Sequence, residues 1–147
     1  MNWKMFMRRE RIVILIKKLA LITDKQSLAI LAPIDLTPSQ YKMIKYLYIR
    51  EGEPVRQVDI EHYYSMTNPA VTGILKNLEA KGWITREQNP EDSRSKLIRL
   101  TSMALSRKEE LYSYGDQIEN ALIHDLTEEE QDTLVRLLGK LIRQEKE

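Results

Sequence analysis

The chain has 147 residues, 42% of them hydrophobic and 31% charged, which suits one compact domain that buries about 70% of its unfolded surface. It has no cysteine, which excludes disulfides, thiolate metal sites and cysteine nucleophiles. Its two histidines, His62 and His124, lie far apart in the sequence, so we expect no metal site. Five glycines and five prolines are few for a turn-rich β protein, so we expect a mainly α fold.

The net charge of +1 hides an uneven distribution along the chain. Residues 1–66 carry 11 basic and 7 acidic side chains, residues 67–101 carry 6 and 4, and residues 102–147 carry 6 and 11. A basic region of this kind is one sign of nucleic-acid binding, although solvated helix faces produce the same distribution. The longest apolar run, residues 12–16, is much shorter than the roughly 20 residues that cross a membrane. We therefore expect a cytoplasmic protein with no membrane partner.

The first part of the chain predicts two helices. Residues 3–32 carry apolar side chains on nearly every side, so the first helix needs to be covered on more than one face. Pro33 ends this segment. A second helix is expected from Pro38 to about residue 50, because Thr37 supplies an N-cap and Gln40 completes a capping box.

The next two helices are short and are joined by a tight polar turn. Residues 56–64 form the first, and Pro69 lies in the first turn of the second, which ends near Gly82. Two short helices joined in this way predict a helix-turn-helix. The residues of the second helix that share one face are Val71, Ile74, Leu75 and Leu78.

A β-hairpin and further helices complete the predicted elements. Residues 83–86 and 96–101 favour strands, and turn-forming residues lie between them, so this segment is a candidate wing. A helix is expected over residues 102–124. Thr127 and Glu130 form a capping box that starts a last helix. Its apolar stripe is Leu134, Leu137, Leu138, Leu141 and Ile142.

Two motifs and the order of the predicted elements resemble those of a known family. Residues 70–84 are similar to a recognition helix that runs into the first strand of a wing. Residues 89–96, followed by Leu100 and Thr101, are similar to an Asp-x-Arg wing motif. The chain resembles the MarR family of winged helix-turn-helix regulators over essentially its whole length.

The resemblance implies a single domain over residues 1–147, organised as a winged helix-turn-helix lobe with N- and C-terminal helices. Residues 37–101 are expected to bind double-stranded DNA, with a two-stranded β wing. Residues 1–36 and 102–147 are expected to form the dimerisation region. The implied function is that of a homodimeric repressor on a pseudo-palindromic operator. A winged-helix module that binds only protein is the alternative.

The recognition helix presents a small polar face opposite its apolar stripe. At 100° per residue, the face is centred on Gly73 and Lys76. Thr72 and Asn77 are suited to base edges and Lys76 to phosphate. Gly73 stands where the family often has a basic residue. The candidate DNA-binding residues are Asn68, Pro69, Ala70, Thr72, Gly73, Lys76, Asn77, Arg86, Arg94 and Lys96.

The tip of the wing offers one pair of opposite charges. Asp92 and Arg94 are two residues apart, so in an extended tip they project on the same side and are expected to form an ion pair that supports Arg94. For Arg94 the resemblance implies insertion into the narrow minor groove of A·T-rich DNA. An exposed ion pair without a ligand is the alternative. Arg86 and Lys96 are phosphate contacts or solubilising charges.

The sequence offers little for catalysis and no cofactor is expected. It has no glycine-rich phosphate loop and no Ser-His-Asp spacing, and residues 128–130 are first-turn acids that suit a helix dipole. We therefore expect no enzyme. The resemblance implies a cleft where the first, second and fifth helices meet. Tyr41, Tyr48 and Tyr112 are candidate walls for a small aromatic or amphipathic effector there.

Overall fold

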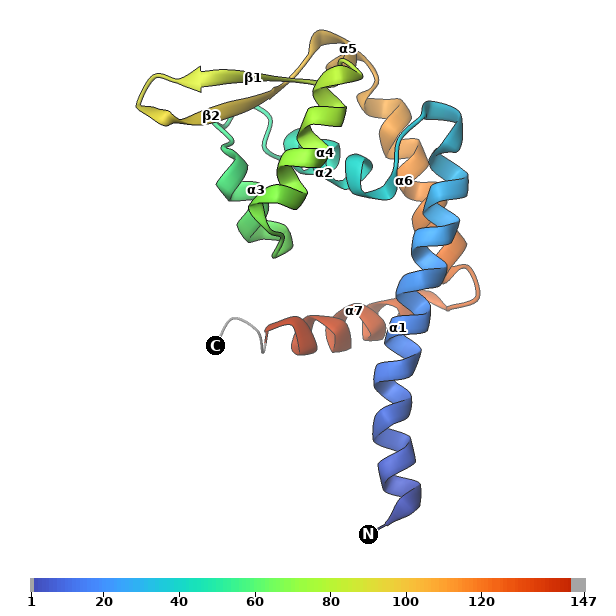
Figure 1. The fold of residues 1–147 in the computed structure, drawn as a ribbon. Coiled ribbons are helices and arrows are strands. Elements are labelled where there is room, and N and C mark those ends of the chain that lie inside the picture. The colour runs from blue at the N-terminus through green and yellow to red at the C-terminus, as the bar shows by residue number, and fades with distance from the viewer. Residues whose placement is uncertain (1, 144–147) are drawn as a thin grey trace. The chain divides into compact units, whose positions relative to one another are not determined.

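The structure of the protein, a computed structural model, describes residues 2–143, with the backbone alone described for residues 6–10. It confirms the mainly α fold class with a two-stranded antiparallel hairpin (Figure 1). The elements are α1 (Trp3–Leu31), the 3-10 helix η1 (Ala32–Ile34), α2 (Pro38–Ile49), α3 (Gln57–Tyr64), α4 (Asn68–Ala80), β1 (Ile84–Asn89), β2 (Asp92–Leu100), α5 (Ser102–Ser106), α6 (Lys108–Ile123) and α7 (Glu128–Arg143). None of the described helices has both the length and the apolar character that a membrane span requires.

The chain divides into two compact units. The winged unit is Ser27–Tyr114, and the terminal unit consists of the described parts of Met1–Gln26 and Gly115–Glu147. Both boundaries fall within long helices, α1 and α6, and not in linkers. Residue 1 and residues 144–147, at the ends of the predicted dimerisation segments, lie outside the described residues.

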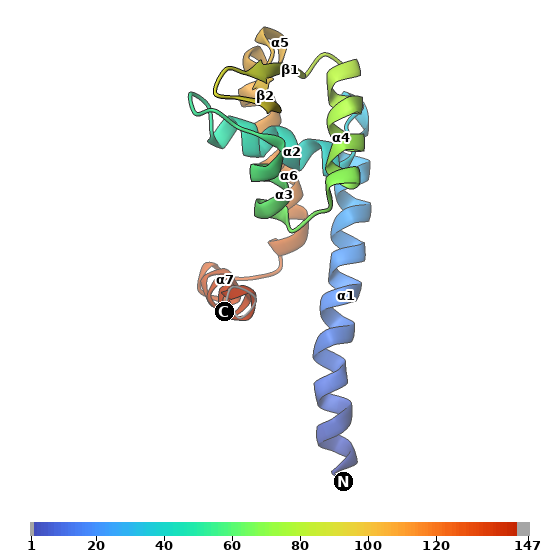
Figure 2. The same cartoon turned by 60° about the vertical axis from the view of Figure 1, so that its left-hand side comes forward.

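The hydrophobic core that the structure describes lies in the winged unit. Side chains from α2, α3, α4, the hairpin and the start of α6 meet there, and α3 packs against α4 (Figures 1 and 2). The largest fully buried ones are Leu31, Met43, Ile44, Ile60, Val71, Leu75, Leu78, Ile84 and Leu111. Of the stripe predicted on α4, Ile74 alone is half-buried.

Local capping starts α2 where the sequence places it. Thr37 Oγ1 accepts a hydrogen bond from Gln40 N, and Gln40 Oε1 accepts one from Thr37 N, both at 3.1 Å. Gln40 is buried, and its Oε1 also accepts a hydrogen bond from Lys81 Nζ at 3.0 Å. The capping box therefore also links α2 to the end of α4.

A left-handed residue turns the chain from α4 into β1. Gly82 has a φ of +81°, a conformation that costs glycine little. Trp83 N donates to Leu78 O at 3.0 Å, which closes the helix end. Thr101 Oγ1 donates to Gly82 O at 2.6 Å and Thr101 N to Trp83 O at 3.1 Å. The base of the hairpin is thus fixed to the end of α4.

The helix predicted over residues 102–124 is two helices, so the prediction of one continuous helix was wrong although its outer boundaries agree to within one residue. Thr101 caps the short α5, and Arg107 leaves the helical conformation between α5 and α6. Its guanidinium lies 4.9 Å from the centre of the Trp83 ring and bonds both oxygens of Glu110 at 2.9 and 3.0 Å. The break therefore coincides with a contact to a residue outside both helices, which the helical spacing of the sequence does not reveal.

Tyr48 links α2 to α5 through a hydrogen bond from its hydroxyl, and we predict the effect on stability of removing that hydroxyl. Its ring is buried and its hydroxyl donates to Ala104 O, so Tyr48→Phe should lower the free energy of unfolding by about 1 kcal/mol. Burial raises the pKa of Tyr48 from 10.0 to about 12. The stabilisation is complete below pH 10 and is lost as the pH rises from 10 to 12, because the unfolded chain releases this proton first.

Urea unfolding at pH 7 and at several values between 10 and 12 measures both effects. The control is Tyr63→Phe, because Tyr63 is exposed and its hydroxyl has no hydrogen-bond partner among the described residues. Equal stability losses in the two variants at pH 7 would mean that the bond to Ala104 contributes nothing specific. The Tyr48 variant should show the shallower loss of stability above pH 10.

In the terminal unit, α7 starts at the predicted capping box. Thr127 Oγ1 accepts from Glu130 N at 3.1 Å, and Glu130 Oε1 accepts from Thr127 N at 2.9 Å. Apolar side chains of α1 and α7 remain exposed within this unit. They include Ile12, Val13, Ile14, Leu15, Ile16, Leu19, Leu21 and Ile22 on α1, and Val135, Leu137, Leu138, Leu141 and Ile142 on α7.

Candidate nucleic-acid interface

The candidate interface is built around α4. One face of this helix packs against the core of the winged unit, and the opposite face is exposed. Thr67 caps the helix by accepting a hydrogen bond from Ala70 N at 3.4 Å. Val71, Leu75 and Leu78 are buried in the winged unit. The exposed residues on the helix include those that the sequence placed opposite this stripe, together with its first turn. All the exposed ones are Asn68, Pro69, Ala70, Gly73, Lys76, Asn77, Glu79 and Ala80.

Gly73 faces open space. A Cβ built on Gly73 would meet no atom within 4 Å outside its own helical turn. Packing within the described chain therefore gives no reason for a glycine here. The position leaves the backbone of α4 open to close approach by another molecule, at a cost of about 1 kcal/mol in helix stability relative to alanine.

Residues of α3 bond the polar side chains at the start of α4. Gln57 Nε2 donates to Thr72 Oγ1 at 2.9 Å and to Asn68 O at 3.3 Å. Asn68 Nδ2 donates to Glu61 Oε2 at 3.1 Å. Thr72 is half-buried as a result, whereas Asn68 stays exposed. The sequence analysis missed Gln57 and Glu61, because contacts between two helices do not follow from the period of either one.

The hairpin extends away from the helices of the winged unit (Figure 1). Its strands pair from Ile84 with Leu100 to Gln88 with Lys96, and the register shifts after Gln88. The isolated bridge between Arg56 and Leu97 joins β2 to the residue before α3. The wing is thereby attached to the helix-turn-helix through the backbone as well as through its side chains.

The ion pair predicted between Asp92 and Arg94 is not formed, so that prediction was wrong. Asp92 Oδ1 instead accepts a hydrogen bond from the backbone N–H of Arg94 at 3.0 Å. The register of the hairpin shifts here, since Asn89 pairs with Asp92 and Gln88 with Lys96. An aspartate commonly accepts a hydrogen bond from the backbone N–H two residues further along the chain. Asp92 therefore supports the backbone of the wing, and Arg94 is exposed with no ion-pair partner among the described side chains.

Four basic side chains from three parts of the chain line one pocket of 390 Å³ in the winged unit. They are Arg56 before α3, Arg86 on β1, and Arg94 and Lys96 on β2. Gln57, Glu61 and Asn68 line the same pocket. The structure thus brings together three predicted residues of the wing and the start of α4. Arg56 was missed, although it is the first residue of the helix predicted over residues 56–64.

Two of these four cations already have partners. Arg86 bonds both oxygens of Glu79 at 3.2 and 3.4 Å, and this hydrogen bonding lowers the pKa of Glu79. Arg56 Nη2 lies 3.0 Å from Asp59 Oδ1. Arg86 joins β1 to α4, and its role as a phosphate contact stays a prediction. Lys96, like Arg94, is exposed.

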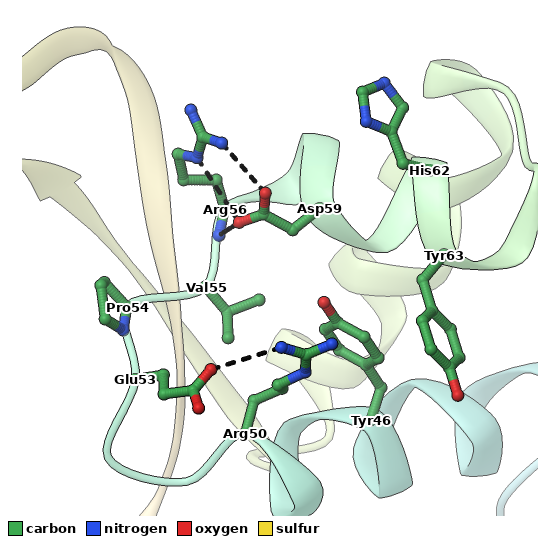
Figure 3. Close-up of a pocket in the computed structure, with 9 residues that line it drawn as sticks. All are labelled: Tyr46, Arg50, Glu53, Pro54, Val55, Arg56, Asp59, His62 and Tyr63. Carbon is green, nitrogen blue, oxygen red and sulfur yellow. Dashed lines mark hydrogen bonds and ion pairs between the residues drawn. The ribbon is translucent and has the colours of Figure 1, made fainter.

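A second, more open pocket of 610 Å³ lies between α2 and α3 (Figure 3). Arg50 stands 5.3 Å from the centre of the Tyr46 ring and bonds Glu53 at 3.4 Å. Burial acts to raise the pKa of Asp59, but the hydrogen bonds from Arg56 outweigh it and the pKa is lowered. Both arginines are therefore paired with acids in this pocket.

The tyrosines predicted to wall an effector site do not line this second pocket. Tyr41 and Tyr48 are buried, and their hydroxyls donate to the backbone oxygens of Leu111 and Ala104. Tyr112 lies with its ring centre 6.0 Å from that of Tyr48. The effector site at these three residues stays a prediction. No group of three or more metal-binding side chains occurs among those that the structure describes.

Comparisons with known proteins agree on one family. The family model described as the MarR family matches residues 36–96. The multiple antibiotic resistance protein MarR of Escherichia coli (strain K12) is 32% identical over 113 residues, which cover 76% of this chain and 77% of that protein. An HTH-type transcriptional regulator of Bacillus subtilis (strain 168), YwoH, is 32% identical over 114 residues, which cover 78% of this chain and 81% of that protein.

Two of the similar solved structures contain DNA. A mutant MarR from E. coli complexed with operator DNA is 28% identical with a TM-score of 0.81, and the match covers 89% of this chain and 93% of that one. The MepR–DNA complex of S. aureus is 29% identical with a TM-score of 0.82, and the match covers 90% of this chain and 96% of that one.

Proposed function

Since this chain belongs to the MarR family, we propose that it is a transcriptional regulator that binds double-stranded DNA as a homodimer. The observation that carries the proposal is the exposed polar face of α4 beside the basic pocket of the wing. A helix with small polar side chains fits a major groove about 12 Å wide, and an exposed arginine on a wing suits a narrow minor groove. The chain has no catalytic role in this proposal.

The DNA-binding surface belongs to residues 37–101, in the winged unit. Residues 1–36 and 102–147 form the dimerisation region in this proposal. The support is the apolar surface that α1 and α7 leave exposed, with Ile12 at 55% and Leu141 at 49% exposed. Surfaces of this kind are normally covered by a partner, and a second copy of the chain covers them with two-fold symmetry.

The regulator acts as a repressor that occupies a pseudo-palindromic operator. A two-fold dimer presents one α4 to each half-site, so the half-sites lie about one helical turn apart. A small aromatic or amphipathic anion releases the operator by preferring a spacing of the two recognition helices that does not fit the groove. In this proposal the effector is bound without covalent chemistry, beside Tyr41, Tyr48 and Tyr112.

Two alanine variants separate the types of DNA contact and test the proposal. Arg94→Ala should weaken binding about tenfold on operators with A·T-rich flanks and much less on G·C-rich flanks, because only the former have the narrow groove. Lys76→Ala is the matched control, since it removes one exposed cation from the same unit. It should weaken binding to all DNA sequences alike. It should also reduce the slope of log affinity against log salt concentration by about one per subunit.

Fluorescence anisotropy with the two operator types, over a range of salt concentrations, measures these effects. Equal losses for Arg94→Ala on both flanks would remove minor-groove reading from the proposal. If the affinity of the wild type did not change with salt concentration, DNA binding would be contradicted altogether, because phosphate contacts release counterions and make binding depend on salt. That second result is the one expected of a winged-helix module that binds only protein.

Effector release predicts reciprocal coupling between two ligands. A ligand that weakens operator binding must itself bind less tightly when operator is present, by the same factor, typically fivefold to 150-fold. Isothermal titration of salicylate with and without operator measures this factor. Equal salicylate affinities in the two titrations would show that its site does not regulate DNA binding, and Tyr112→Ala tests whether the predicted wall takes part.

A further inference from the structure

The pocket between α2 and α3 contains a buried tyrosine whose hydroxyl is not satisfied within the described chain. Tyr46 is only 5% exposed, and its hydroxyl has no hydrogen-bond partner among the described residues. Figure 3 shows this hydroxyl directed away from α2, into the space that Arg50, Val55 and Asp59 surround. A buried tyrosine usually has a partner for its hydroxyl. This one is therefore available to a molecule that enters the pocket.

The charges around the Tyr46 hydroxyl are balanced. Burial raises the pKa of Tyr46, and among the charged groups Arg50 acts to lower this pKa while Asp59 and Glu53 act to raise it. The hydroxyl therefore keeps its proton at neutral pH. Arg56 also lines the pocket, which thus holds two arginines and two carboxylates. A ligand with a single charge meets like charges here, whereas a zwitterion can place each of its charges beside an opposite one.

The two ion pairs of the pocket differ in how firmly they are held. Asp59 accepts three hydrogen bonds from Arg56, at distances of 2.8 to 3.4 Å. Arg50 and Glu53 share a single contact of 3.4 Å, and their side chains are 42% and 62% exposed. An exposed pair of this kind contributes little to stability. Arg50 and Glu53 can therefore exchange each other for the two ends of a ligand at little cost.

One wall of the pocket offers an aromatic surface. Tyr63 is 58% exposed, and its ring centre lies 4.9 Å from that of Tyr46. A second ring can stack on such an exposed ring. The remaining lining residues are Pro54, Val55 and His62. The volume of 610 Å³ is within the range of small-molecule sites, so the pocket has room for a ligand that carries both a ring and a charged end.

We propose that this pocket binds an aromatic α-amino acid in its zwitterionic form. The carboxylate of the ligand accepts hydrogen bonds from Arg50 and from the Tyr46 hydroxyl. Its ammonium group donates to Glu53, and its ring stacks on Tyr63. Two charge-assisted contacts thereby replace the weak pair between Arg50 and Glu53. The inference goes beyond the proposed DNA-binding function and does not depend on it.

Titrations of the whole chain with four small molecules test the class of ligand. Phenylalanine is the zwitterion, phenethylamine lacks its carboxylate, 3-phenylpropionate lacks its ammonium group, and glycine lacks its ring. Phenylalanine should bind at least about tenfold more tightly than each of the others, because each lacks either a charge-assisted hydrogen bond or the buried ring. Chemical shifts in protein NMR spectra at pH 7 measure these affinities into the millimolar range.

Three substitutions assign the ends of the ligand to their residues. Tyr46→Phe should weaken phenylalanine binding about fivefold without lowering the urea midpoint of unfolding, because the hydroxyl has no partner among the described residues. Arg50→Gln should reduce the preference for phenylalanine over phenethylamine to less than about threefold. Glu53→Gln should do the same to the preference over 3-phenylpropionate. General loosening of the fold does not produce such selective losses.

Two matched controls change the same residue types outside this pocket. Arg99→Gln removes an exposed arginine that is paired with Glu87 at 2.9 Å. Tyr114→Phe removes a tyrosine hydroxyl that also has no hydrogen-bond partner among the described residues. Neither substitution should change the affinity for phenylalanine, because neither residue lines the pocket.

Three results overturn the inference. Equal affinities for phenylalanine and the two singly charged probes would show that the pocket does not select a zwitterion. An unchanged affinity in Tyr46→Phe would mean that phenylalanine binds elsewhere on the protein. The absence of a saturable shift with any of the four molecules would show that the pocket binds no ligand of this class. Operator binding can be intact in all three cases, so these results leave the proposed function untouched.

Discussion

Inserting five base pairs between the half-sites of the operator should reduce its affinity for the protein about a thousandfold. Five base pairs are about half a helical turn, so the insertion moves the second half-site to the opposite side of the duplex. The two copies of α4 in a rigid dimer cannot then enter the major groove at both half-sites. Each complex keeps one specific contact surface and loses the other.

The control for this insertion is the same five base pairs placed outside the two half-sites. It adds equal length and equal charge but leaves the spacing intact, so the affinity should not change. Electrophoretic mobility shifts with both duplexes provide the measurement. Unchanged affinity for the inner insertion would contradict symmetric docking and would point to half-sites read by independent subunits.

Leu138→Lys should convert the dimer into monomers and thereby abolish tight operator binding. Leu138 is 38% exposed on α7 and lies at the centre of the apolar stripe. Burial of one leucine contributes about 1.5–3 kcal/mol, and a two-fold dimer carries the substitution once in each subunit, so the loss is doubled. Burying the new charge costs more still, so the dimer dissociation constant should rise at least about a thousandfold.

Thr133→Lys is the matched control for this substitution. It adds the same charge to the same helix, but about 140° away from Leu138 around the axis, and Thr133 is exposed. Sedimentation velocity should show a dimer for Thr133→Lys and a monomer for Leu138→Lys, while circular dichroism shows equal helix content. A dimer in both variants would place the interface on a different surface.

Elements set by local chemistry could be predicted from the sequence. The capping boxes at Thr37 and Thr127 and the buried stripe of α4 depend on residues three or four apart, whose geometry a helix determines. The fold class and the family, which were predicted from the order of these elements, are confirmed. The exposed face of α4 followed directly from its buried face.

Contacts between elements could not be predicted in this way. Arg86 meets Glu79 across the turn from α4 to β1, and Gln57 meets Thr72 across two helices. Arg107, at the break between α5 and α6, contacts the Trp83 ring, in another part of the unit. A period in the sequence describes one element at a time, so these partners appear only when the elements are packed together.

In the wing, the sequence also failed to predict a contact between residues that are close together in the chain. Asp92 and Arg94 have the spacing of a side-chain pair in a regular strand, but the register of the hairpin shifts beside them and the Asp92 carboxylate accepts from the backbone N–H of Arg94. The sequence identified both residues, and the backbone conformation determined what they do. Arg94 is left exposed for contact with another molecule.

Selection of bound sites from random duplex DNA tests the central claim most directly, namely that this chain reads DNA sequence as a symmetric dimer. The wild-type protein should enrich duplexes that contain two inverted half-sites with centres about 10 base pairs apart. The enriched duplexes should bind at least about a thousandfold more tightly than unselected DNA at the same salt concentration. A selected pool with no sequence in common, bound no more tightly than the starting pool, would contradict the claim.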